Sequence, residues 1–114
     1  MFWNRSRSRV AQVTPVEAHE RVVNGEGILI DVREPHEWRA GHAAGARHIP
    51  LEQLSTRAAE LAKDRPIYVI CASGSRSQLA AEMLHEAGFV CPINVSGGTG
   101  AWQRSNLPME RGDG

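Results

Sequence analysis

The segment from residue 66 to residue 88 most constrains how this chain can fold. A short apolar run rich in β-forming residues occupies positions 66–70, and Cys71 follows it directly. Residues 72–77 are small and polar and include a glycine, and residues 78–87 have the composition of a helix that Gly88 stops. This order predicts a buried strand, a tight loop and a helix, with a thiol where the strand ends.

The rest of the chain alternates in the same way between helical and strand-like segments. Thr14, Pro15 and Glu17 have the pattern of a capping box, which predicts a helix that ends near residues 24–25. Strands are predicted at residues 27–32, 46–49 and 89–95, and helices at residues 34–40, 51–62 and 99–105. Strands that alternate with helices predict an α/β fold, in which a central parallel sheet has helices on both faces.

The length and composition favour one domain rather than several. A chain of 114 residues is long enough for one core. We expect that domain at residues 13–108, after a basic N-terminal lead at residues 1–12 with arginines at 5, 7 and 9, and before a flexible tail at residues 109–114. The formal net charge of zero indicates neither nucleic acid nor an anionic membrane as the main partner.

The cysteine count and the hydropathy pattern indicate in which cellular compartment the protein is expected. Two cysteines exclude a disulfide-dense secreted scaffold. The sequence contains no apolar run of signal-peptide or transmembrane length. We therefore expect a cytoplasmic protein, and a reducing compartment would keep a nucleophilic thiol reduced.

Polar or glycine residues follow three of the predicted strands. Cys71 follows the strand at residues 66–70, Asp31 and Arg33 lie at the end of the strand at 27–32, and residues 96–98 end the strand at 89–95. In open parallel sheets, ligands bind at the carboxyl ends of the strands. We therefore expect these three segments to meet at one edge of the sheet.

The loop after Cys71 has the properties of an anion-binding cradle. Backbone N–H groups in a tight loop that leads into a helix point at whatever the sulfur carries. Gly74 lets the backbone turn where a Cβ would clash, and Arg76 adds a permanent positive charge. Such surroundings lower a thiol pKa from about 8.5 into a range of roughly 3.5–7.5. We interpret Cys71 as a nucleophile; a buried structural cysteine is the alternative.

The candidate site has a catalytic pair, a binding loop and two supporting residues. The catalytic residues are Cys71 and Arg76, the substrate-binding residues are Ala72, Ser73, Gly74, Ser75 and Ser77, and Asp31 and Arg33 support the loop. Arg76 would donate either to oxygens of an anionic substrate or to carbonyls of the loop. Ser77 could equally be the helix cap. Asp31 would hold the shape of the catalytic loop, and Arg33 would pair with a carboxylate such as Glu37.

Several other aromatic, histidine and cysteine residues are interpreted as having structural roles. Trp38 and Trp102 are expected to pack the rim of the site, and His42 to make a structural hydrogen bond. The spacing of six between His36, His42 and His48 does not match zinc-binding patterns, so no metal site is predicted. Cys91 is interpreted as a core residue, which could act as a resolving thiol only if it came near Cys71.

Three motifs in this order resemble the signatures of the rhodanese family. Residues 31–38 (DVREPHEW) with residues 41–46 (GHAAGA) resemble the first signature, residues 71–77 (CASGSRS) the active-site loop, and residues 97–102 (GGTGAW) the C-terminal signature. The resemblance covers roughly residues 14–108. Ala43 and Ala44 depart from it, because the family usually has Ile-Pro there, so a rigid turn is lost.

The resemblance implies a rhodanese-like fold and a sulfurtransferase reaction. The thiolate of Cys71 would take a sulfane sulfur from a donor such as thiosulfate and become a persulfide. A thiophilic acceptor, cyanide or a thiol, would then remove that sulfur. The implied partners are a small sulfur donor (thiosulfate or a persulfide), the thiol or cyanide acceptor, and a sulfur-relay protein as a further option; no cofactor is implied.

Two alternatives of different classes remain open. Related phosphatases and arsenate reductases use a cysteine-based loop with one more residue, whereas this chain has four residues between Cys71 and Arg76. A shorter loop makes a smaller cradle, which suits a sulfur atom better than a phosphate or an arsenate. The other alternative is a non-catalytic rhodanese-fold module for sulfur relay or protein binding. Such modules usually lack the cysteine, and Cys71, Gly74 and Arg76 are present here.

Overall fold

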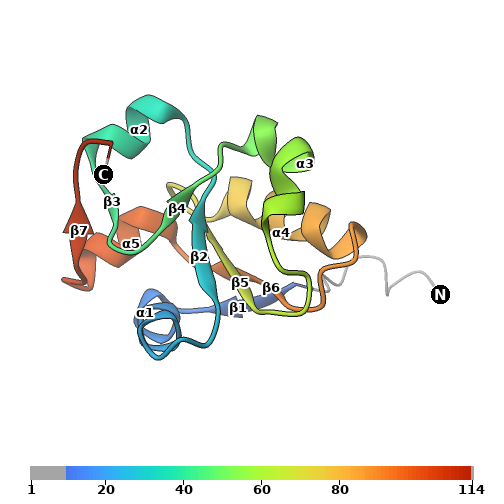
Figure 1. Cartoon of the computed structure of the whole chain (residues 1–114). Helices are drawn as coiled ribbons and strands as arrows, with labels where there is room; N and C mark the ends of the chain where they lie inside the picture. The colour runs from blue at the N-terminus through green and yellow to red at the C-terminus, as the bar shows by residue number, and fades with distance from the viewer. Residues whose placement is uncertain (1–9, 114) are drawn as a thin grey trace.

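A five-stranded sheet whose strands all run parallel forms the centre of the structure (Figure 1). The structure is a computed structural model and describes residues 10–113. The strands lie in the order β1-β6-β5-β2-β4. Their bounds are Ala11–Val13 for β1, Pro92–Val95 for β6, Ile67–Ile70 for β5, Ile28–Asp31 for β2 and Arg47–His48 for β4.

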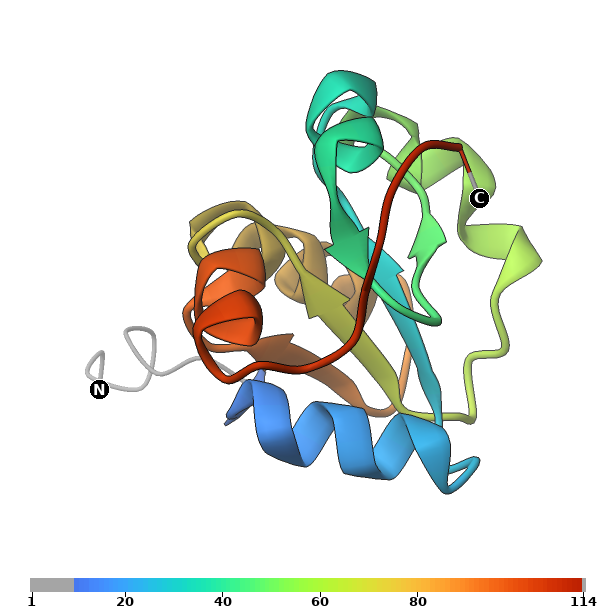
Figure 2. The ribbon, with the colours of Figure 1, turned by 90° about the vertical axis from the view of Figure 1, so that its left-hand side faces the viewer.

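Helices cover both faces of this sheet, which confirms the predicted α/β fold (Figures 1 and 2). The helices are α1 (Pro15–Val23), α2 (Pro35–Ala40), α3 (Leu54–Arg57), α4 (Ser75–Glu86) and α5 (Gly98–Arg104). Short 3₁₀ turns, η2 (Leu51–Gln53) and η3 (Ala58–Glu60), flank α3. Within residues 10–113, no helix is long and apolar enough to cross a membrane.

The apolar side chains of the central strands divide the core between the two faces. Because successive side chains of a strand point to opposite faces, Ile30 packs in the cluster that contains Leu54 and Leu84 of α3 and α4. Its neighbour Leu29 packs in the cluster that contains Trp102 of α5 and a residue of α1. All four residues of β5 are buried, as the apolar run at residues 66–70 predicts.

Helix α4 begins at Ser75, three residues before the predicted start. Its N-cap is Gly74, which has the left-handed φ of 113°. Because the helix starts early, Arg76 and Ser77 belong to its first turn, and the prediction that Ser77 could cap this helix is wrong. This start places the hydroxyl of Ser77 beside the sulfur of Cys71 and directs Arg76 toward α2.

The predicted helix at residues 51–62 is divided into η2, α3 and η3. The apolar spacing still identifies the inward face correctly, because Leu54 and Leu61 are buried and Leu51 and Ala58 are packed against the same core. The prediction of one continuous helix is wrong, because the backbone at Gln53 and Arg57 departs from helical values, with ψ near 0°. Periodicity reports which side chains face the core, and it does not report the hydrogen-bond pattern between them.

The segments predicted to be an N-terminal lead and a C-terminal tail both contain residues of a strand. Strand β1 crosses the boundary placed after residue 12, and it pairs with β6. Strand β7 (Met109–Glu110), in the segment predicted to be a flexible tail, pairs antiparallel with β3 (His42–Ala43). Both strands are too short to show a periodic pattern. The arginines at 5, 7 and 9 of the predicted basic lead lie outside the described residues.

The predicted strand at residues 89–95 begins only at Pro92. Phe89 is buried in the core and its N–H donates to the carbonyl of Leu84, so it closes α4 instead of extending the sheet. Cys91 therefore lies just before β6 and is only partly buried. The strand register places it beside the start of β5, roughly 16 Å of strand away from Cys71. Cys91 is not placed to act as a resolving thiol.

Candidate active site

Cys71 lies at the carboxyl end of β5, and its side chain is enclosed by the loop that follows. The residue is fully buried. The backbone N–H of Gly74 donates to its Sγ at 3.1 Å, and the hydroxyl of Ser77 lies 3.2 Å from the same sulfur. The strand fixes the Cα, and the tight turn at Gly74 brings the first turn of α4 back over the sulfur.

The pKa of the Cys71 thiol is lowered by these surroundings. Burial by itself raises that pKa, because it removes water from the thiolate. Hydrogen bonds from the Ser77 hydroxyl and from the backbone of Ser77, Gly74 and Ser73 outweigh burial. The main causes are therefore donors of the loop and of the helix start. Arg76 contributes through its charge at longer range, since the thiolate in turn raises the pKa of Arg76.

The turn between β6 and α5 closes on the backbone of the Cys71 loop. The N–H and the hydroxyl of Thr99 donate to the carbonyl of Cys71 at 2.8 and 3.0 Å, and the N–H of Gly100 donates to the carbonyl of Ala72. Gly98 has a φ of 61°, and a Cβ on it would lie 2.4 Å from the carbonyl oxygen of Cys71. Two of the three predicted segments therefore meet at this edge, and glycine permits the close approach.

Arg76 connects the catalytic loop to α2. Its Nη1 and Nη2 donate to the two carboxylate oxygens of Glu37 at 2.8 and 3.0 Å. These hydrogen bonds lower the pKa of Glu37 to about 2 and raise the pKa of Arg76. The structure shows Arg76 donating to a carboxylate rather than to carbonyls of the loop, so its guanidinium is held in place at the edge of the site.

Arg33 pairs with Asp31 rather than with Glu37, so the predicted partner is wrong. The Arg33 guanidinium donates to both carboxylate oxygens of Asp31 at 2.9–3.1 Å and to the carbonyl of Gly41 at 2.7 Å. Among the described residues, the Asp31 carboxylate accepts hydrogen bonds from Arg33 and from no residue of the loop after Cys71. The pair braces the segment from β2 through α2 and thereby positions Glu37.

A polar network behind Cys71 contains two residues that the sequence analysis missed. The hydroxyl of Ser77 donates to the amide oxygen of Asn94 on β6, at 2.5 Å. The amide nitrogen of Asn94 donates to the carbonyl of Gly74 and to the side chain of Gln12 on β1. Asn94 is buried, so it connects the two groups that donate to the sulfur. A polar residue inside an otherwise apolar strand was the available signal.

Aromatic side chains of the first motif stack beside the site. Trp38 lies against the ring of His42, with centroids 3.4 Å apart, and against that of His48. His42 Nδ1 lies 2.7 Å from the carbonyl of Trp38, which confirms a structural hydrogen bond. Trp102 is fully buried in the core and does not pack the rim, so its predicted place is wrong.

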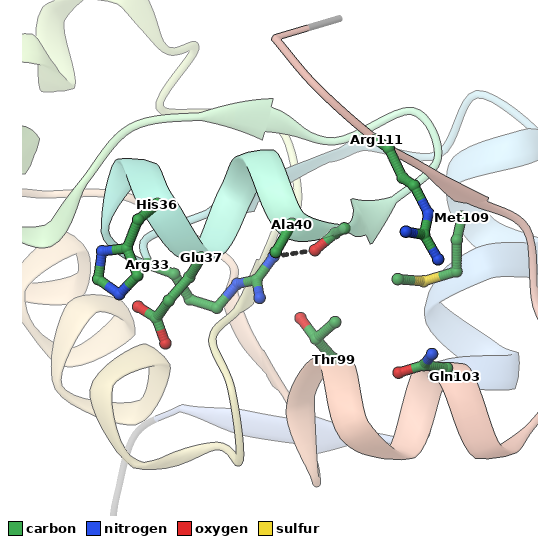
Figure 3. Close-up of a pocket in the computed structure, with 9 residues that line it drawn as sticks. Arg33, His36, Glu37, Ala40, Thr99, Gln103, Met109 and Arg111 are labelled. Atoms are coloured by element: carbon green, nitrogen blue, oxygen red, sulfur yellow. Dashed lines mark hydrogen bonds between the residues drawn. The ribbon is translucent and has the colours of Figure 1, made fainter.

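A cavity of about 370 Å³ opens beside the catalytic loop, between α2, α5 and the C-terminal strand (Figure 3). Its lining residues are Arg33, His36, Glu37, Ala40, Gly41, Thr99, Gln103, Met109 and Arg111. Two of them contact the loop directly, because Glu37 binds Arg76 and Thr99 donates to the carbonyl of Cys71. The remaining predicted binding residues differ in exposure: Ser73 and Ser75 are exposed and Ala72 is half-buried.

Comparison with known proteins identifies a matching family model and a related sequence. A family model described as Rhodanese-like domain matches residues 14–105. The chain is 46% identical over 74 residues to the uncharacterized protein YqhL of Bacillus subtilis (strain 168), a match that covers 65% of this chain and 59% of that protein. The chain therefore spans about three fifths of this relative's length.

Solved structures share the architecture as well. The polysulfide-sulfur transferase homodimer of Wolinella succinogenes matches with a TM-score of 0.79 and 29% identity, over 91% of this chain and 80% of that one. The thiosulfate sulfurtransferase of Pseudomonas aeruginosa matches with a TM-score of 0.81 and 25% identity, over 91% of this chain and 21% of that one. Both similarities extend over nearly all of the sheet and helices described above.

Proposed function

The chain belongs to the rhodanese-like domain family, and on this premise we propose that it is a sulfurtransferase that carries a sulfane sulfur as a persulfide on Cys71. The donor is thiosulfate or another sulfane sulfur compound, and the acceptor is cyanide or a thiol. One observation carries the proposal: a buried Sγ with a lowered pKa, at a strand end, receives hydrogen bonds from the turn and helix that follow it.

The proposed reaction has two displacement steps. The Cys71 thiolate attacks the outer sulfur of thiosulfate, the S–S bond of thiosulfate breaks, and sulfite leaves with the electron pair. The acceptor's lone pair then attacks the terminal sulfur of the persulfide, and Cys71 leaves as a thiolate. This is covalent catalysis in which one nucleophile serves both half-reactions. The two steps need no external oxidant or reductant. The sulfur moves as a neutral atom, and each leaving group keeps the electron pair of the bond that breaks.

The loop residues stabilise the anionic sulfur during both steps. The backbone N–H groups and the Ser77 hydroxyl that lower the thiol pKa also stabilise Cys71 as the leaving group of the second step. The permanent charge of Arg76 lies at the edge of the loop, held by Glu37. The names of the Wolinella and Pseudomonas proteins refer to sulfur transfer, which supports the same reaction class for this chain.

Mass spectrometry of the intact protein after thiosulfate treatment tests the first half-reaction. We expect a gain of one sulfur atom that maps to Cys71, and loss of this sulfur when cyanide is added. The Cys71→Ser variant should gain no sulfur and should lose thiosulfate:cyanide activity, because a hydroxyl cannot carry the sulfane sulfur. Cys91→Ser is the matched control and should keep most of the activity. The opposite behaviour of the two variants would refute the assignment.

The same variants separate this function from the phosphatase alternative. Four residues lie between Cys71 and Arg76, and the short loop favours a single sulfur over a tetrahedral oxyanion. We expect no hydrolysis of p-nitrophenyl phosphate above background by the wild-type protein. Hydrolysis that disappears in Cys71→Ser would favour the phosphatase reading instead.

A further inference from the structure

The cavity beside the catalytic loop has one wall that the sequence analysis left outside the domain. Met109 and Arg111 come from β7 and the residue after it, and β7 is held in place by its pairing with β3. The opposite walls come from α2 and from α5 (Figure 3). The C-terminal segment therefore completes a cavity whose other walls contact the catalytic loop.

The charges that face this cavity do not cancel. Arg33 is neutralised by Asp31, and Glu37 is neutralised by Arg76. Within residues 10–113, Arg111 makes no ion pair, so it leaves the cavity with an excess positive charge. A cavity with a net positive charge favours a ligand of the opposite sign.

Arg33 also presents a donor to the cavity. Its side chain is 7% exposed, and its Nε and Nη2 are used by Asp31 and Gly41. Its Nη1 has no hydrogen-bond partner among the described residues, and the guanidinium borders the cavity (Figure 3). A guanidinium donor that faces a cavity can bind an acceptor there, which water or a ligand supplies.

The remaining lining suits a small organic anion. Thr99 and Gln103 offer polar side chains on α5, while Ala40 and Met109 offer apolar surface. The volume of about 370 Å³ falls within the range of pockets that hold small molecules. It is too small for a folded partner, although a small acceptor fits.

We propose that this cavity binds the sulfur acceptor, and that the acceptor is a small thiol that carries a carboxylate. The carboxylate lies between Arg111 and Arg33, and the thiol end points toward the catalytic loop. This inference rests on the sulfurtransferase function proposed above. In the transfer step the acceptor thiol loses its proton, its thiolate attacks the terminal sulfur of the Cys71 persulfide, and the persulfide S–S bond breaks. The products are the acceptor persulfide and the Cys71 thiolate.

The test compares acids with their neutral amides as acceptors. The probes are ω-mercapto carboxylic acids of three to six carbons and the corresponding primary amides, which differ in charge and little in size. KM for each probe is measured with the thiosulfate-loaded protein. We expect wild type to prefer at least one acid over its amide. Arg111→Gln should raise KM for that acid by roughly 2- to 5-fold, as expected for one exposed ion pair, and leave KM for the amide unchanged.

A second variant in the cavity and a control variant outside it extend the test beyond Arg111. Gln103→Glu adds a negative charge to the same cavity and should raise KM for the acid in the same direction. Arg65→Gln is the charge-matched control, because Arg65 lies where β5 begins, at the opposite edge of the sheet, and donates to the carbonyl of Gly25. It should leave the acid preference intact. The KM for thiosulfate with cyanide as acceptor should be unchanged in Arg65→Gln, and in the two cavity variants it should change less than the KM for the acid.

Binding without turnover separates this inference from the proposed function. The S-methyl derivative of the preferred acid cannot accept sulfur, and we expect it to shift the amide NMR resonances of Gln103 and Arg111, with weaker binding to Arg111→Gln. Absence of those shifts, or equal KM values for every acid and its amide, would overturn the proposal even if Cys71 forms a persulfide. An equal rise in the thiosulfate KM would assign the cavity to the donor and would also overturn it.

Discussion

At the scale of single residues, Cys71 depends on Ser77 more than on any charged neighbour. Ser77 approaches the sulfur with its hydroxyl and its backbone, and both lower the pKa of the thiol. The hydroxyl has only one proton, which it directs either to Sγ or to the oxygen of Asn94. A thiolate attracts that proton more strongly than a thiol does, so the hydrogen bond to sulfur is favoured in the reactive form.

Substitution of Ser77 should make Cys71 less reactive at neutral pH. Hydrogen bonds to charged groups contribute about 1.5–3 kcal/mol, so Ser77→Ala should lower the rate of iodoacetamide alkylation near pH 7 by roughly 10-fold or more. The alkylation midpoint should move to higher pH, because the removed donor favours the thiolate. Ser73→Ala is the control: it keeps the backbone N–H that matters, and no hydrogen bond joins its hydroxyl to the sulfur. An unchanged profile for Ser77→Ala would contradict this account.

Asn94 should act on the same thiol without touching it. It donates to the carbonyl of Gly74, and its amide oxygen lies within hydrogen-bond distance of the Ser77 hydroxyl, so it positions both groups beside the sulfur. We expect Asn94→Ala to shift the alkylation midpoint of Cys71 upward, by less than Ser77→Ala does. The double variant should shift it no further than Ser77→Ala alone if Asn94 acts through the Ser77 hydroxyl. A full additional shift would assign its effect to Gly74 instead.

At the scale of elements, the site depends on how closely the β6–α5 turn approaches the loop after β5. That approach requires Gly98, whose missing side chain leaves room for the carbonyl of Cys71. Hydrogen bonds from Thr99 and Gly100 fix the carbonyls of Cys71 and Ala72. The orientation of the catalytic loop is therefore determined by a turn almost thirty residues later, as well as by its own sequence.

A methyl group at Gly98 should disturb both stability and activity. The added Cβ would overlap backbone atoms of Cys71 and Ala72, and the φ of 61° adds strain. We expect Gly98→Ala to lower the free energy of unfolding by about 2–4 kcal/mol, from overpacking and left-handed strain. Gly45→Ala is the matched control, since Gly45 has a φ of 87° but no atom within 4 Å of its Cβ position. It should cost only about 1 kcal/mol.

Urea unfolding of the two glycine variants measures this difference, and the thiosulfate:cyanide rate reports on the loop. Gly98→Ala should lose most of that rate because the carbonyl of Cys71 is displaced, whereas Gly45→Ala should retain it. Equal losses in the free energy of unfolding of the two variants would show that close packing at Gly98 does not contribute to stability.

At the scale of the whole molecule, the Glu37–Arg76 pair ties α2 to α4 across the mouth of the site. The two elements are separated in the chain by β3, β4, α3 and β5, and this bidentate pair joins them directly. The Glu37 side chain is 24% exposed, so water screens the pair only in part. The pair should therefore contribute to global stability as well as to the position of Arg76.

The contribution of this pair should depend on pH. The pKa of Glu37 is about 2 in the folded protein against a usual value of 4.5, so its stabilisation is complete above pH 4.5 and is lost as pH falls toward 2. The difference corresponds to at most about 3 kcal/mol, and partial screening reduces it to about 2 kcal/mol. Urea unfolding between pH 2 and 7 should show wild type more stable than Glu37→Gln by that amount at pH 7, with the gap closing at low pH.

The exposed Glu52 provides a control for this prediction, because it makes no ion pair within the described residues. Glu52→Gln should show no comparable gap at pH 7. A gap for Glu37→Gln that stays constant from pH 7 to pH 2 would exclude the ion pair as its cause.

The sequence by itself determined the elements that carry chemistry. The buried strand before Cys71, the glycine turn after it and the apolar faces of the helices are local patterns, and the structure has all of them. These patterns also predicted that the segments after β2, β5 and β6 meet at one edge, because parallel strands end together. The family resemblance and the α/β fold followed from the same residues.

Only the tertiary structure decided which side chains pair. Arg33 and Arg76 are both arginines near Glu37, and sequence reasoning chose the wrong partner because side-chain direction depends on where each helix begins. The hydrogen bond between Asn94 and Gln12 and the pairing of the short strands β1 and β7 could not be foreseen, since the partners lie far apart in the chain. Contacts between distant segments carry no local periodicity, so the polar network and the cavity wall emerge only when the chain is folded.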